Sequence, residues 1–467
     1  MTATLSPRPL TEELEPARAG WITEWRPEDD DFWATTGRRV ARRNLIFSIF
    51  AEHLGFSVWV LWSVLVVVLG THPNDFPFLN PKVTANADKI FWLVALPNLI
   101  GALMRLPYTV AVLRFGGRNW TVVSALLLMI PIGLATYCVT HPGTPYWFFL
   151  LTAATAGFGG GNFASSMTNI AFFYPERLKG TALGLNAAGG NIGLSSMQFV
   201  VPLLIFYNAA MVAAPLFWLP LVLAAAVCAY LFMNNLHVSR TPVREQLAVT
   251  REPQAWVMSF LYIGTFGSFL GLAAAFPAVL AFEFPMDQKF YLLGTALLLP
   301  VAFLGPLVGS LARPIGGWLS DRVGGAKVTA AVFALMAVVT LGAIRAADAK
   351  SLSLFLTTML VLFTLAGFGN GSTYKMIPAI FKRQAMLAGR DDTAGFTRAV
   401  RLGSTTLGMA GAIGALGGFY MPRAIGNSIK ATGGITQAFT IFFVMYVVCL
   451  LVTALCYLRP GARLRGV

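Results

Sequence analysis

Twelve long apolar runs constrain this chain more than any other feature of its sequence. Each has about 20 or more residues, enough for a helix rising 1.5 Å per residue to cross a hydrocarbon core of about 30 Å. They lie at approximately 45–70, 88–113, 119–140, 146–173, 180–206, 213–234, 255–281, 290–319, 327–345, 354–380, 398–421 and 436–458. The runs predict an all-α polytopic membrane protein with twelve transmembrane helices.

The composition excludes a soluble globular protein. Hydrophobic residues make up 56% of the 467 residues and charged residues only 12%, whereas about a quarter of the residues are charged in soluble domains. A net charge of +14 would suggest a nucleic-acid partner for a soluble protein, but here the positive residues lie in short loops between the apolar runs. They orient the chain in the membrane, and no nucleic acid is implied.

The loop charges predict that both termini lie in the cytoplasm. Lysine and arginine are frequent in the even-to-odd loops and near both ends, and sparse in the opposite loops. The first set includes Arg114, Arg118, Arg177, Lys179, Arg240, Arg244, Arg251, Arg322, Lys327, Lys382, Arg383, Arg390 and Arg459; the second is Lys82, Lys89, Lys289, Arg345, Lys350, Arg423 and Lys430. Positively charged segments stay on the cytoplasmic side, so both termini lie inside. Two termini on one side require an even number of spans, in agreement with twelve.

One polar stretch divides the chain into two halves of six spans each. Residues 235–254 form the only long connection near the middle, so we expect a cytoplasmic linker between a half at 44–234 and a half at 255–458. Residues 459–467 form a cytoplasmic tail. Residues 1–43 lack the apolar core of a cleavable signal peptide. Their tryptophans and closing arginines suit either a segment on the inner headgroups or a disordered tail.

Two motifs occur once in each half at nearly the same offset. Residues 105–117, Arg-Leu-Pro-Tyr-Thr-Val-Ala-Val-Leu-Arg-Phe-Gly-Gly, return as residues 313–325, Arg-Pro-Ile-Gly-Gly-Trp-Leu-Ser-Asp-Arg-Val-Gly-Gly. Residues 156–163, Ala-Gly-Phe-Gly-Gly-Gly-Asn-Phe, return as 366–373, Ala-Gly-Phe-Gly-Asn-Gly-Ser-Thr. The halves therefore repeat one unit about a pseudo-twofold axis. This is the architecture of major facilitator transporters, whose substrate lies between the repeats near the midplane.

Arg105 and Arg313 open the two copies of the paired motif, and each lies inside an apolar span. A cation in hydrocarbon costs about 2.5–3.5 kcal/mol on insertion scales, so two at matching positions need a partner. Each lies about 12 Å from the inner end of its span, close to the midplane. Guanidinium groups match the oxygens of small oxyanions and stay charged, so we expect an anion between them. The alternative is that they snorkel inward or bond to helix carbonyls.

The fifth and eleventh spans are rich in glycine. The positions that we expect to serve packing or gating are Gly189, Gly190, Gly193, Gly408, Gly411 and Gly414. Such small-residue faces let helices touch and slide. Asn191 lies among the first three, and its amide can donate to an anion oxygen or bond to a neighbouring helix.

Nothing in the sequence indicates a cofactor, a metal site or catalysis. Cys138, Cys228, Cys449 and Cys456 lie in apolar spans without metal-ligand spacing, so we expect them to pack. A membrane-embedded sensor or enzyme is the alternative from another class. The chain offers no soluble domain, nucleotide loop or buried His, Asp and Glu cluster for it.

Several motifs together resemble one transporter family. Gly-Gly-Gly-Asn-Phe-Ala-Ser-Ser-Met at 159–167, Leu-Gly-Leu-Asn-Ala-Ala-Gly-Gly-Asn-Ile-Gly at 183–193, Tyr-Ile-Gly-Thr-Phe-Gly-Ser-Phe at 262–269 and the glycine-rich 408–418 are similar to the NarK-type nitrate/nitrite porter family. Trp25-Arg-Pro-Glu before the first span is similar as well, so the resemblance covers nearly the whole chain. It implies nitrate and nitrite as substrates and a place among the lipids of the bacterial cytoplasmic membrane. The sequence does not determine the oligomeric state, and we expect a monomer.

The resemblance also implies a site. Its residues are Arg105 and Arg313 as the anion clamp, Phe163 and Phe266 on either side of the anion plane, and Asn191 and Tyr262 as hydrogen-bonding groups. Tyr262 and Phe266 are one helical turn apart and share a face. Without the resemblance, each phenylalanine would more often be core or lipid-facing bulk. Gly411 stands where some family members present a hydroxyl, which leaves a polar contact from that span unsupported.

Residues 316–325 resemble the facilitator loop motif between the second and third helix of a half. Asp321 and Arg322 are expected to latch helix ends in one state without touching the substrate. In the first copy Leu113 replaces the aspartate, so that latch is weaker. Lys375 lies near the inner end of its span, where we expect it to snorkel rather than bind substrate.

The expected mode is obligatory exchange of nitrate for nitrite by alternating access. The alternatives are nitrate/proton symport and exchange of another small anion. Glu52, with His53 beside it, is the only clear titrating candidate in the spans, and a proton-coupled carrier usually needs such a group near its site. Two bare arginines about 8 Å apart repel by about 2 kcal/mol at an effective dielectric constant of about 20. An anion cancels that repulsion, so the loaded carrier rocks more easily than the empty one.

Overall fold

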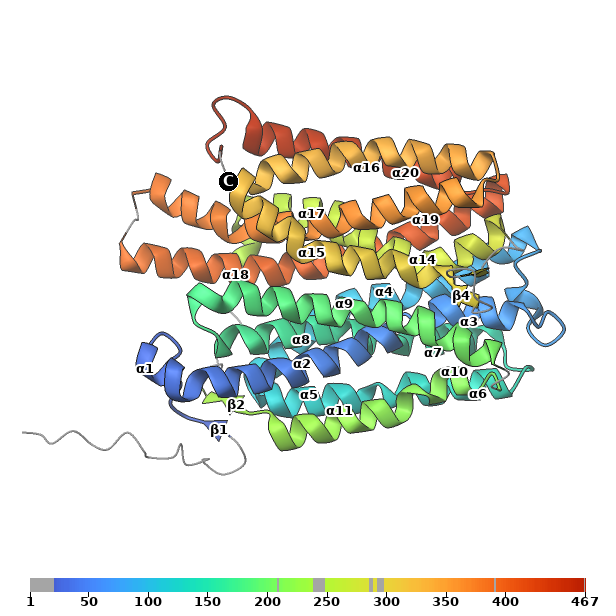
Figure 1. The fold of residues 1–467 in the computed structure, drawn as a ribbon, viewed down its shortest axis with the longest axis horizontal. Helices are drawn as coiled ribbons and strands as arrows, with labels where there is room; N and C mark the ends of the chain where they lie inside the picture. Colours follow the sequence, from blue (N-terminus) through green and yellow to red (C-terminus); the bar gives the residue numbers. More distant parts are fainter. Residues whose placement is uncertain are drawn as a thin grey trace, which may run out of the picture.

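The computed structural model describes residues 21–207, 210–237, 248–284, 289–291, 298–389, 392–465 and 467. Long helices run side by side along one axis of the molecule (Figure 1). The two ends of the described chain lie at the same end of this bundle, on the left in Figure 1, which we call the terminal side. A chain that crosses the bundle an even number of times has both of its ends on the same side.

The described residues of the first half form eleven α-helices, α1 to α11. The elements in order are β1 (Trp21–Ile22), α1 (Asp30–Phe32), η1 (Trp33–Gly37), α2 (Arg38–Trp59), α3 (Leu61–Gly70), η2 (Pro77–Leu79), η3 (Thr84–Asn86), α4 (Ala87–Phe115), α5 (Gly117–Leu127), α6 (Met129–Thr140), α7 (Tyr146–Ala156), α8 (Phe158–Phe173), α9 (Glu176–Phe206), α10 (Ala213–Leu216) and α11 (Trp218–Phe232).

The linker region and the second half follow. Their described elements are β2 (Asn235–Leu236), η5 (Ala248–Arg251), α13 (Pro253–Tyr262), η6 (Ile263–Gly267), α14 (Ser268–Glu283), β3 (Lys289–Tyr291), β4 (Leu298–Pro300), η7 (Val301–Phe303), α15 (Leu304–Val323), α16 (Gly325–Asp348), α17 (Leu352–Leu387), α18 (Thr393–Ala415), α19 (Gly417–Thr432), α20 (Thr436–Thr453) and η8 (Ala454–Leu458). Part of the predicted linker lies outside the described residues.

Each of the twelve predicted spans overlaps a helical segment of the described residues. Within the described residues, nine segments are long and apolar enough to cross a membrane. The three predicted spans that do not reach this threshold correspond to α7 with α8, to α15, and to α18 with α19. The polytopic helical fold is therefore confirmed, while the count of twelve stays a prediction.

The start of the eighth span was predicted wrongly. The apolar run begins at residue 290, but β3 and β4 pair antiparallel there and the helix α15 begins only at Leu304. Pro300 explains part of the difference, because the residue before a proline is disfavoured in the α conformation. Apolar length alone does not separate a helix from a short buried strand.

Two segments form the centre of the bundle. In the most apolar stretch of Asp30–Gly70, 89% of the residues are buried, and in that of Pro253–Glu283, 94% are buried. The corresponding share in Thr436–Leu458 is 28%, so this helix faces outward over most of its surface. The first and seventh predicted spans, which are equivalent in the repeat, therefore line the middle of the molecule.

The two Arg-x-Gly-Gly turns share one conformation. Gly116 ends α4 with φ of 87°, and Gly324 ends α15 with φ of 101°. Side chains rarely tolerate this region, so both turns require glycine. Gly116 is also crowded, because a Cβ atom there would lie 2.3 Å from Oδ1 of Asn235. The shared turn supports the sequence repeat at the level of backbone conformation.

The segment before α2 packs on the protein. β1 pairs in parallel with β2, joining Trp21 to Asn235 at the terminal side. The buried Trp25 contacts Phe173 edge-on at 5.4 Å between ring centroids, and the buried Trp33 contacts Tyr174 at 5.6 Å. These aromatic side chains, which the sequence placed on headgroups or in a disordered tail, thus cover the end of α8.

Candidate functional site

The two paired arginines lie within long helices and are buried. Arg105 on α4 is 1% exposed and Arg313 on α15 is 4% exposed. A proline follows each arginine within two residues, Pro107 in α4 and Pro314 in α15. A proline inside a helix has no backbone N–H, so each helix lacks one backbone hydrogen bond near its arginine.

Two phenylalanines lie beside both guanidinium groups. Cζ of Arg105 is 4.5 Å from the ring centroid of Phe163 on α8 and 5.0 Å from that of Phe266 on η6. Cζ of Arg313 is 5.8 Å and 6.0 Å from the same centroids. Phe266 lies in a π-helical turn, a feature frequent at functional sites. The structure therefore brings together four residues that the sequence predicted to form one site.

The two phenyl rings touch each other in this structure. Their centroids are 5.7 Å apart and the ring planes are inclined by 31°. A flat anion between two rings needs van der Waals contact of about 3.5 Å on each side, or about 7 Å in all. The predicted sandwich of Phe163, anion and Phe266 therefore requires the rings to separate by more than 1 Å from the positions seen here.

Both guanidinium groups have N–H donors that make no hydrogen bond to the described residues. Arg105 donates from Nη1 to the Gly411 carbonyl oxygen at 2.6 Å, and Arg313 donates from Nη2 to the Tyr262 hydroxyl at 3.2 Å. Nε and Nη2 of Arg105 and Nη1 of Arg313 are buried without a partner among the described residues. Buried unpaired donors are costly, so a ligand that accepts from them is strongly favoured.

Gly411 contributes a backbone hydrogen-bond acceptor to the site. The sequence left a polar contact from the eleventh span unsupported because this position has no side chain, but its backbone carbonyl accepts from Arg105. A Cβ atom at Gly411 would lie 3.2 Å from Nη1 of Arg105 and 3.7 Å from Phe163. Helix α18 thus reaches the site through its backbone.

Asn191 is buried, and no hydrogen bond joins it to either arginine among the described residues. Both polar atoms of its amide lack a hydrogen-bond partner among the described residues. Tyr262, in contrast, stacks on Phe266 at 5.1 Å and accepts from Arg313. Of the two hydrogen-bonding residues implied by the resemblance, Tyr262 bonds to an arginine among the described residues, and the role of Asn191 stays a prediction.

Sequence reasoning missed two aromatic neighbours of the arginines. The ring of Tyr374 on α17 lies 5.3 Å from Cζ of Arg313, and the ring of Trp59 on α2 lies 5.7 Å from Cζ of Arg105. One signal was available for Tyr374, which follows Thr373, the repeat counterpart of Phe163. Nothing in the local sequence distinguished Trp59 from packing residues.

The glycines differ in how closely they are packed. Added Cβ atoms at Gly189, Gly190 and Gly193 would lie within 2.1–2.4 Å of atoms of α2, and one at Gly414 would lie 2.7 Å from Tyr262. One at Gly408 would meet no described atom within 4 Å. Close approach of α9 to α2 therefore explains the first three glycines, and a gating role for any of the six stays a prediction.

The predicted latch residues lie on the terminal side. Asp321 pairs with Lys375 of α17 at 2.8 Å, and Cζ of Arg322 lies 4.1 Å from the centroid of the Trp318 ring. Lys375 therefore extends away from the arginine pair, as the snorkelling prediction requires. The pair ties α15 to α17 within the second half.

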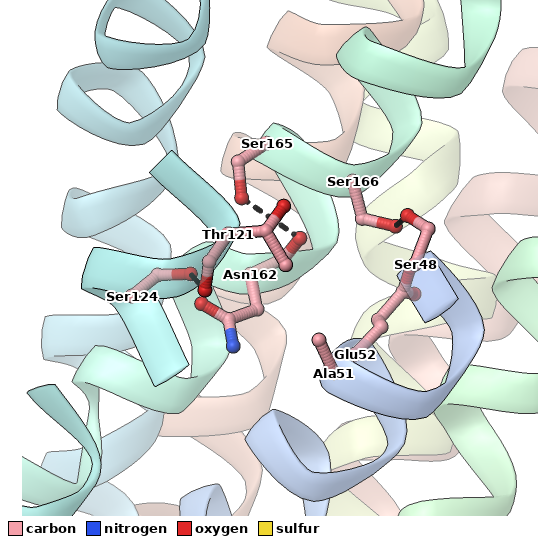
Figure 2. A pocket seen from close by; sticks show the side chains of 8 residues that line it. All are labelled: Ser48, Ala51, Glu52, Thr121, Ser124, Asn162, Ser165 and Ser166. Atoms are coloured by element: carbon pink, nitrogen blue, oxygen red, sulfur yellow. Dashed lines mark hydrogen bonds between the residues drawn. The ribbon is translucent and has the colours of Figure 1, made fainter. Parts of the chain in front are cut away.

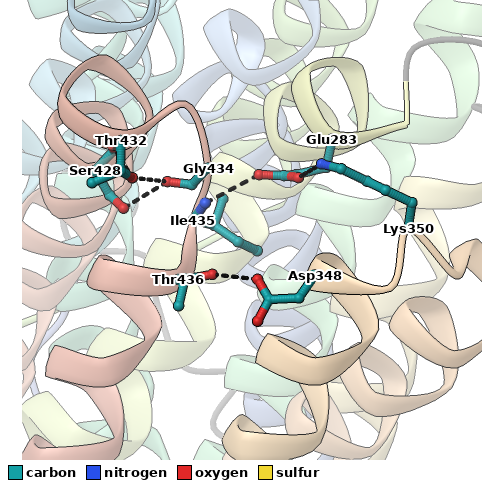
Figure 3. A network of polar contacts seen from close by, with 8 residues as sticks. All are labelled: Glu283, Asp348, Lys350, Ser428, Thr432, Gly434, Ile435 and Thr436. Atoms are coloured by element: carbon teal, nitrogen blue, oxygen red, sulfur yellow. Dashed lines mark hydrogen bonds and ion pairs between the residues drawn. The ribbon is translucent and has the colours of Figure 1, made fainter.

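The opposite side holds polar contacts within and between the halves. Glu283 at the end of α14 pairs with Lys350 at 2.5 Å and accepts from the Ile435 amide at 3.1 Å, while Thr436 donates to Asp348 (Figure 3). Between the halves, Arg423 of α19 donates to Asp88 of α4 at 2.7 Å. These bonds hold the helix ends together on that side.

Glu52 is buried in the first half. It lies on α2 and accepts from the Asn186 amide of α9 at 2.8 Å. Figure 2 shows it at one edge of a polar pocket lined by Ser48, Ala51, Glu52, Thr121, Ser124, Asn162, Ser165 and Ser166. Among the described residues, no three His, Cys, Asp or Glu side chains are grouped to hold a metal ion.

Comparisons with known sequences agree with the predicted family. The family model described as Major Facilitator Superfamily matches residues 45–396 of this chain. The chain is 38% identical to Nitrate/nitrite transporter NarU of Salmonella typhimurium over 474 residues, covering 96% of this chain and 99% of the relative. It is 36% identical to Probable nitrate/nitrite antiporter NarK2 of Thermus thermophilus over 483 residues, covering 96% and 99%.

Two solved structures share the fold. A D-xylose-proton symporter superposes with a TM-score of 0.63 at 13% identity, covering 89% of this chain and 97% of that one. The human organic anion transporter MFSD10 (TETRAN) gives a TM-score of 0.58 at 15% identity, covering 90% and 99%. At these identities the likeness concerns the helical architecture alone.

Proposed function

We propose a function from the premise that this chain belongs to the Major Facilitator Superfamily and, within it, to the NarK-type nitrate/nitrite porter family. The protein carries nitrate and nitrite across the membrane, with the anion held between Arg105 and Arg313. One observation carries this proposal. Two buried guanidinium groups, one from each half, lie beside the same pair of phenyl rings and keep unpaired donors.

The chemistry of the site suits a flat, singly charged anion. Guanidinium groups donate in pairs to planar oxyanions, and aromatic walls favour an ion that gives up its hydration easily. The names of the relatives, a nitrate/nitrite transporter and a probable nitrate/nitrite antiporter, supply the substrates within that class.

Exchange is the mode that the arginine pair favours. The distances of 4.5 and 5.8 Å to the same Phe163 centroid place the two Cζ atoms at most about 10 Å apart. At such separations the two charges repel by about 2 kcal/mol at an effective dielectric constant of about 20. A bound anion cancels this repulsion, so the loaded carrier changes conformation readily and the empty carrier stalls.

Proton-coupled nitrate uptake is a second candidate, and one observation favours it. Glu52 is buried on α2, one helical turn before Phe56, whose ring centroid is 6.1 Å from that of Phe163 beside both arginines. An ionised carboxylate there would offset part of the repulsion in the empty carrier and let it return without an anion. We also propose that the termini are cytoplasmic in a bacterial inner membrane, as the loop charges indicate.

Proteoliposomes containing the purified protein separate the two modes. Nitrate uptake is measured with and without internal nitrite, and with and without an imposed pH gradient. We expect rapid uptake only when nitrite is inside, whatever the gradient. Rapid uptake into nitrite-free vesicles driven by the gradient would replace exchange by symport, and no nitrate uptake under any condition would contradict the proposed substrate.

A further inference from the structure

One buried carboxyl group lies near the arginine pair, because Glu52 is one helical turn before Phe56 on α2 and the Phe56 ring centroid is 6.1 Å from that of Phe163, the ring beside both arginines. Glu52 is 1% exposed and sits on α2, one of the two central segments of the bundle. The charged or titratable groups around it are Arg313 and Arg105 from α15 and α4, Tyr374 from α17, and the neighbouring His53. Nδ1 of His53 forms a hydrogen bond with the Gly189 carbonyl oxygen at 3.1 Å.

The hydrogen bonds around Glu52 are incomplete. Oε2 accepts from Nδ2 of Asn186 at 2.8 Å, and the same amide lies 2.6 Å from the Ser166 hydroxyl, which bonds to Ser48 at 2.8 Å. Oε1 has no partner among the described residues. Ionised carboxylates in protein interiors are normally paired or hydrogen-bonded, and here one of the two oxygens lacks a donor among the described residues. The surroundings therefore suit a carboxyl group that gains and loses a proton.

A polar pocket adjoins the carboxyl group. Figure 2 shows Glu52 and Ser48 from α2 on one side, and Thr121 and Ser124 from α5 on the other. Asn162 of α8 lies between them, and its amide atoms are unpaired among the described residues. Hydroxyl groups both donate and accept hydrogen bonds, so these side chains provide neighbours through which a proton can pass.

We propose that Glu52 is a proton-binding site coupled to the anion site. With Glu52 ionised, the arginine pair and the carboxylate carry a net charge of +1, and protonation raises this to +2. Protonation therefore strengthens anion binding, and by linkage a bound anion favours the protonated form. The inference rests on the proposed anion site and holds for exchange and for uptake, because in exchange the two protons cancel.

Calorimetric titration of the purified, full-length protein with nitrate tests the coupling. Titrations in buffers of different ionisation enthalpy give the number of protons taken up for each nitrate bound. For the wild type we expect a measurable fraction of one proton, and an affinity that weakens with rising pH by up to about tenfold for each unit. Glu52→Gln should bind nitrate with no proton uptake and no pH dependence.

Two controls separate Glu52 from other titratable groups. Glu283→Gln makes the same change at another buried carboxylate, near the opposite side, and His53→Gln removes the neighbouring imidazole. Both should keep the wild-type proton uptake. Uptake that survives in Glu52→Gln, or nitrate binding by the wild type without uptake at every pH, would overturn the inference while leaving the anion site intact. Absence of nitrate binding to the wild type would overturn both.

Discussion

Arg105 and Arg313 occupy equivalent positions in the repeat but are held differently. Arg105 donates across the halves, to the Gly411 carbonyl of α18 at 2.6 Å. Arg313 donates within its own half, to the Tyr262 hydroxyl at 3.2 Å. Arg105 also lies closer to Phe163, at 4.5 Å compared with 5.8 Å. The site is therefore symmetric in sequence and asymmetric in its contacts.

Under the proposed alternating access, this difference gives the two arginines separate tasks. Alternating access moves one half against the other, so the bond between Arg105 and Gly411 must change when the carrier moves. The bond between Arg313 and Tyr262 can persist, since both lie in the second half. We infer that Arg105 links the anion to the movement, whereas Arg313 mainly holds the anion.

The largest effect is expected from replacing either arginine by lysine. An ammonium keeps the charge but loses the fork that contacts two oxygens. Each of Arg105→Lys and Arg313→Lys should weaken nitrate binding by at least about 30-fold, or about 2 kcal/mol. Calorimetry measures the affinity, and size-exclusion chromatography checks folding. Wild-type affinity in either folded variant would remove that arginine from the clamp.

A smaller effect is expected from Tyr262→Phe. The change removes the hydroxyl that accepts from Arg313, and hydrogen bonds to charged groups contribute about 1.5–3 kcal/mol, so affinity should fall about tenfold or more. Tyr446→Phe is the matched control, because its buried hydroxyl bonds to Ser268 at 3.0 Å, away from the arginines. Equal losses in the two variants would mean that Tyr262 acts through general stability.

Gly411→Ala should alter movement more than binding. The new methyl group would lie 3.2 Å from Nη1 of Arg105, so the cross-half bond must adjust by a few tenths of an ångström. We expect exchange in proteoliposomes to slow by about threefold to tenfold, about 1 kcal/mol, with little change in affinity. Gly408→Ala, where a Cβ atom meets nothing within 4 Å, should exchange normally. The same rate in both variants would contradict the linking role of Arg105.

The smallest effect is expected at the latch. Lys375→Met removes an exposed ion pair with Asp321, and such pairs contribute about 0.2–1 kcal/mol. Nitrate affinity should not change, because Lys375 extends away from the arginines. A loss of affinity comparable to that of Arg313→Lys would give Lys375 a substrate role, against the prediction from its place near the inner end of the span.

The sequence predicted the pairing of the site better than its details. Arg105 and Arg313 could be found because a repeated cation in an apolar span has few explanations. The Gly411 contact could not, since a backbone carbonyl has no sequence signature. The contact between the Phe163 and Phe266 rings was equally hidden, because ring spacing depends on the positions of the two halves. Phe163 and Phe266 themselves came from the family resemblance.

For the fold, as for the site, the sequence predicted the main features but not the contacts between distant segments. Long apolar runs predicted the membrane helices, because a membrane span leaves little choice of structure. The strands β3 and β4 before Leu304 were not predicted, because an apolar run alone does not distinguish a helix from a strand. The packing of Trp25 and Trp33 on the end of α8 was missed because contacts distant in sequence leave no local pattern. Glu52 was noticed, but its complete burial and its bond to Asn186 required the structure.

A structure of the protein with bound nitrate, at a concentration that saturates binding in calorimetry, tests the central claim most directly. The account predicts planar density that accepts from both Arg105 and Arg313, with the rings of Phe163 and Phe266 moved apart from their present 5.7 Å to hold it. Nitrate density elsewhere, with both guanidinium groups bonded as they are here, would contradict the account.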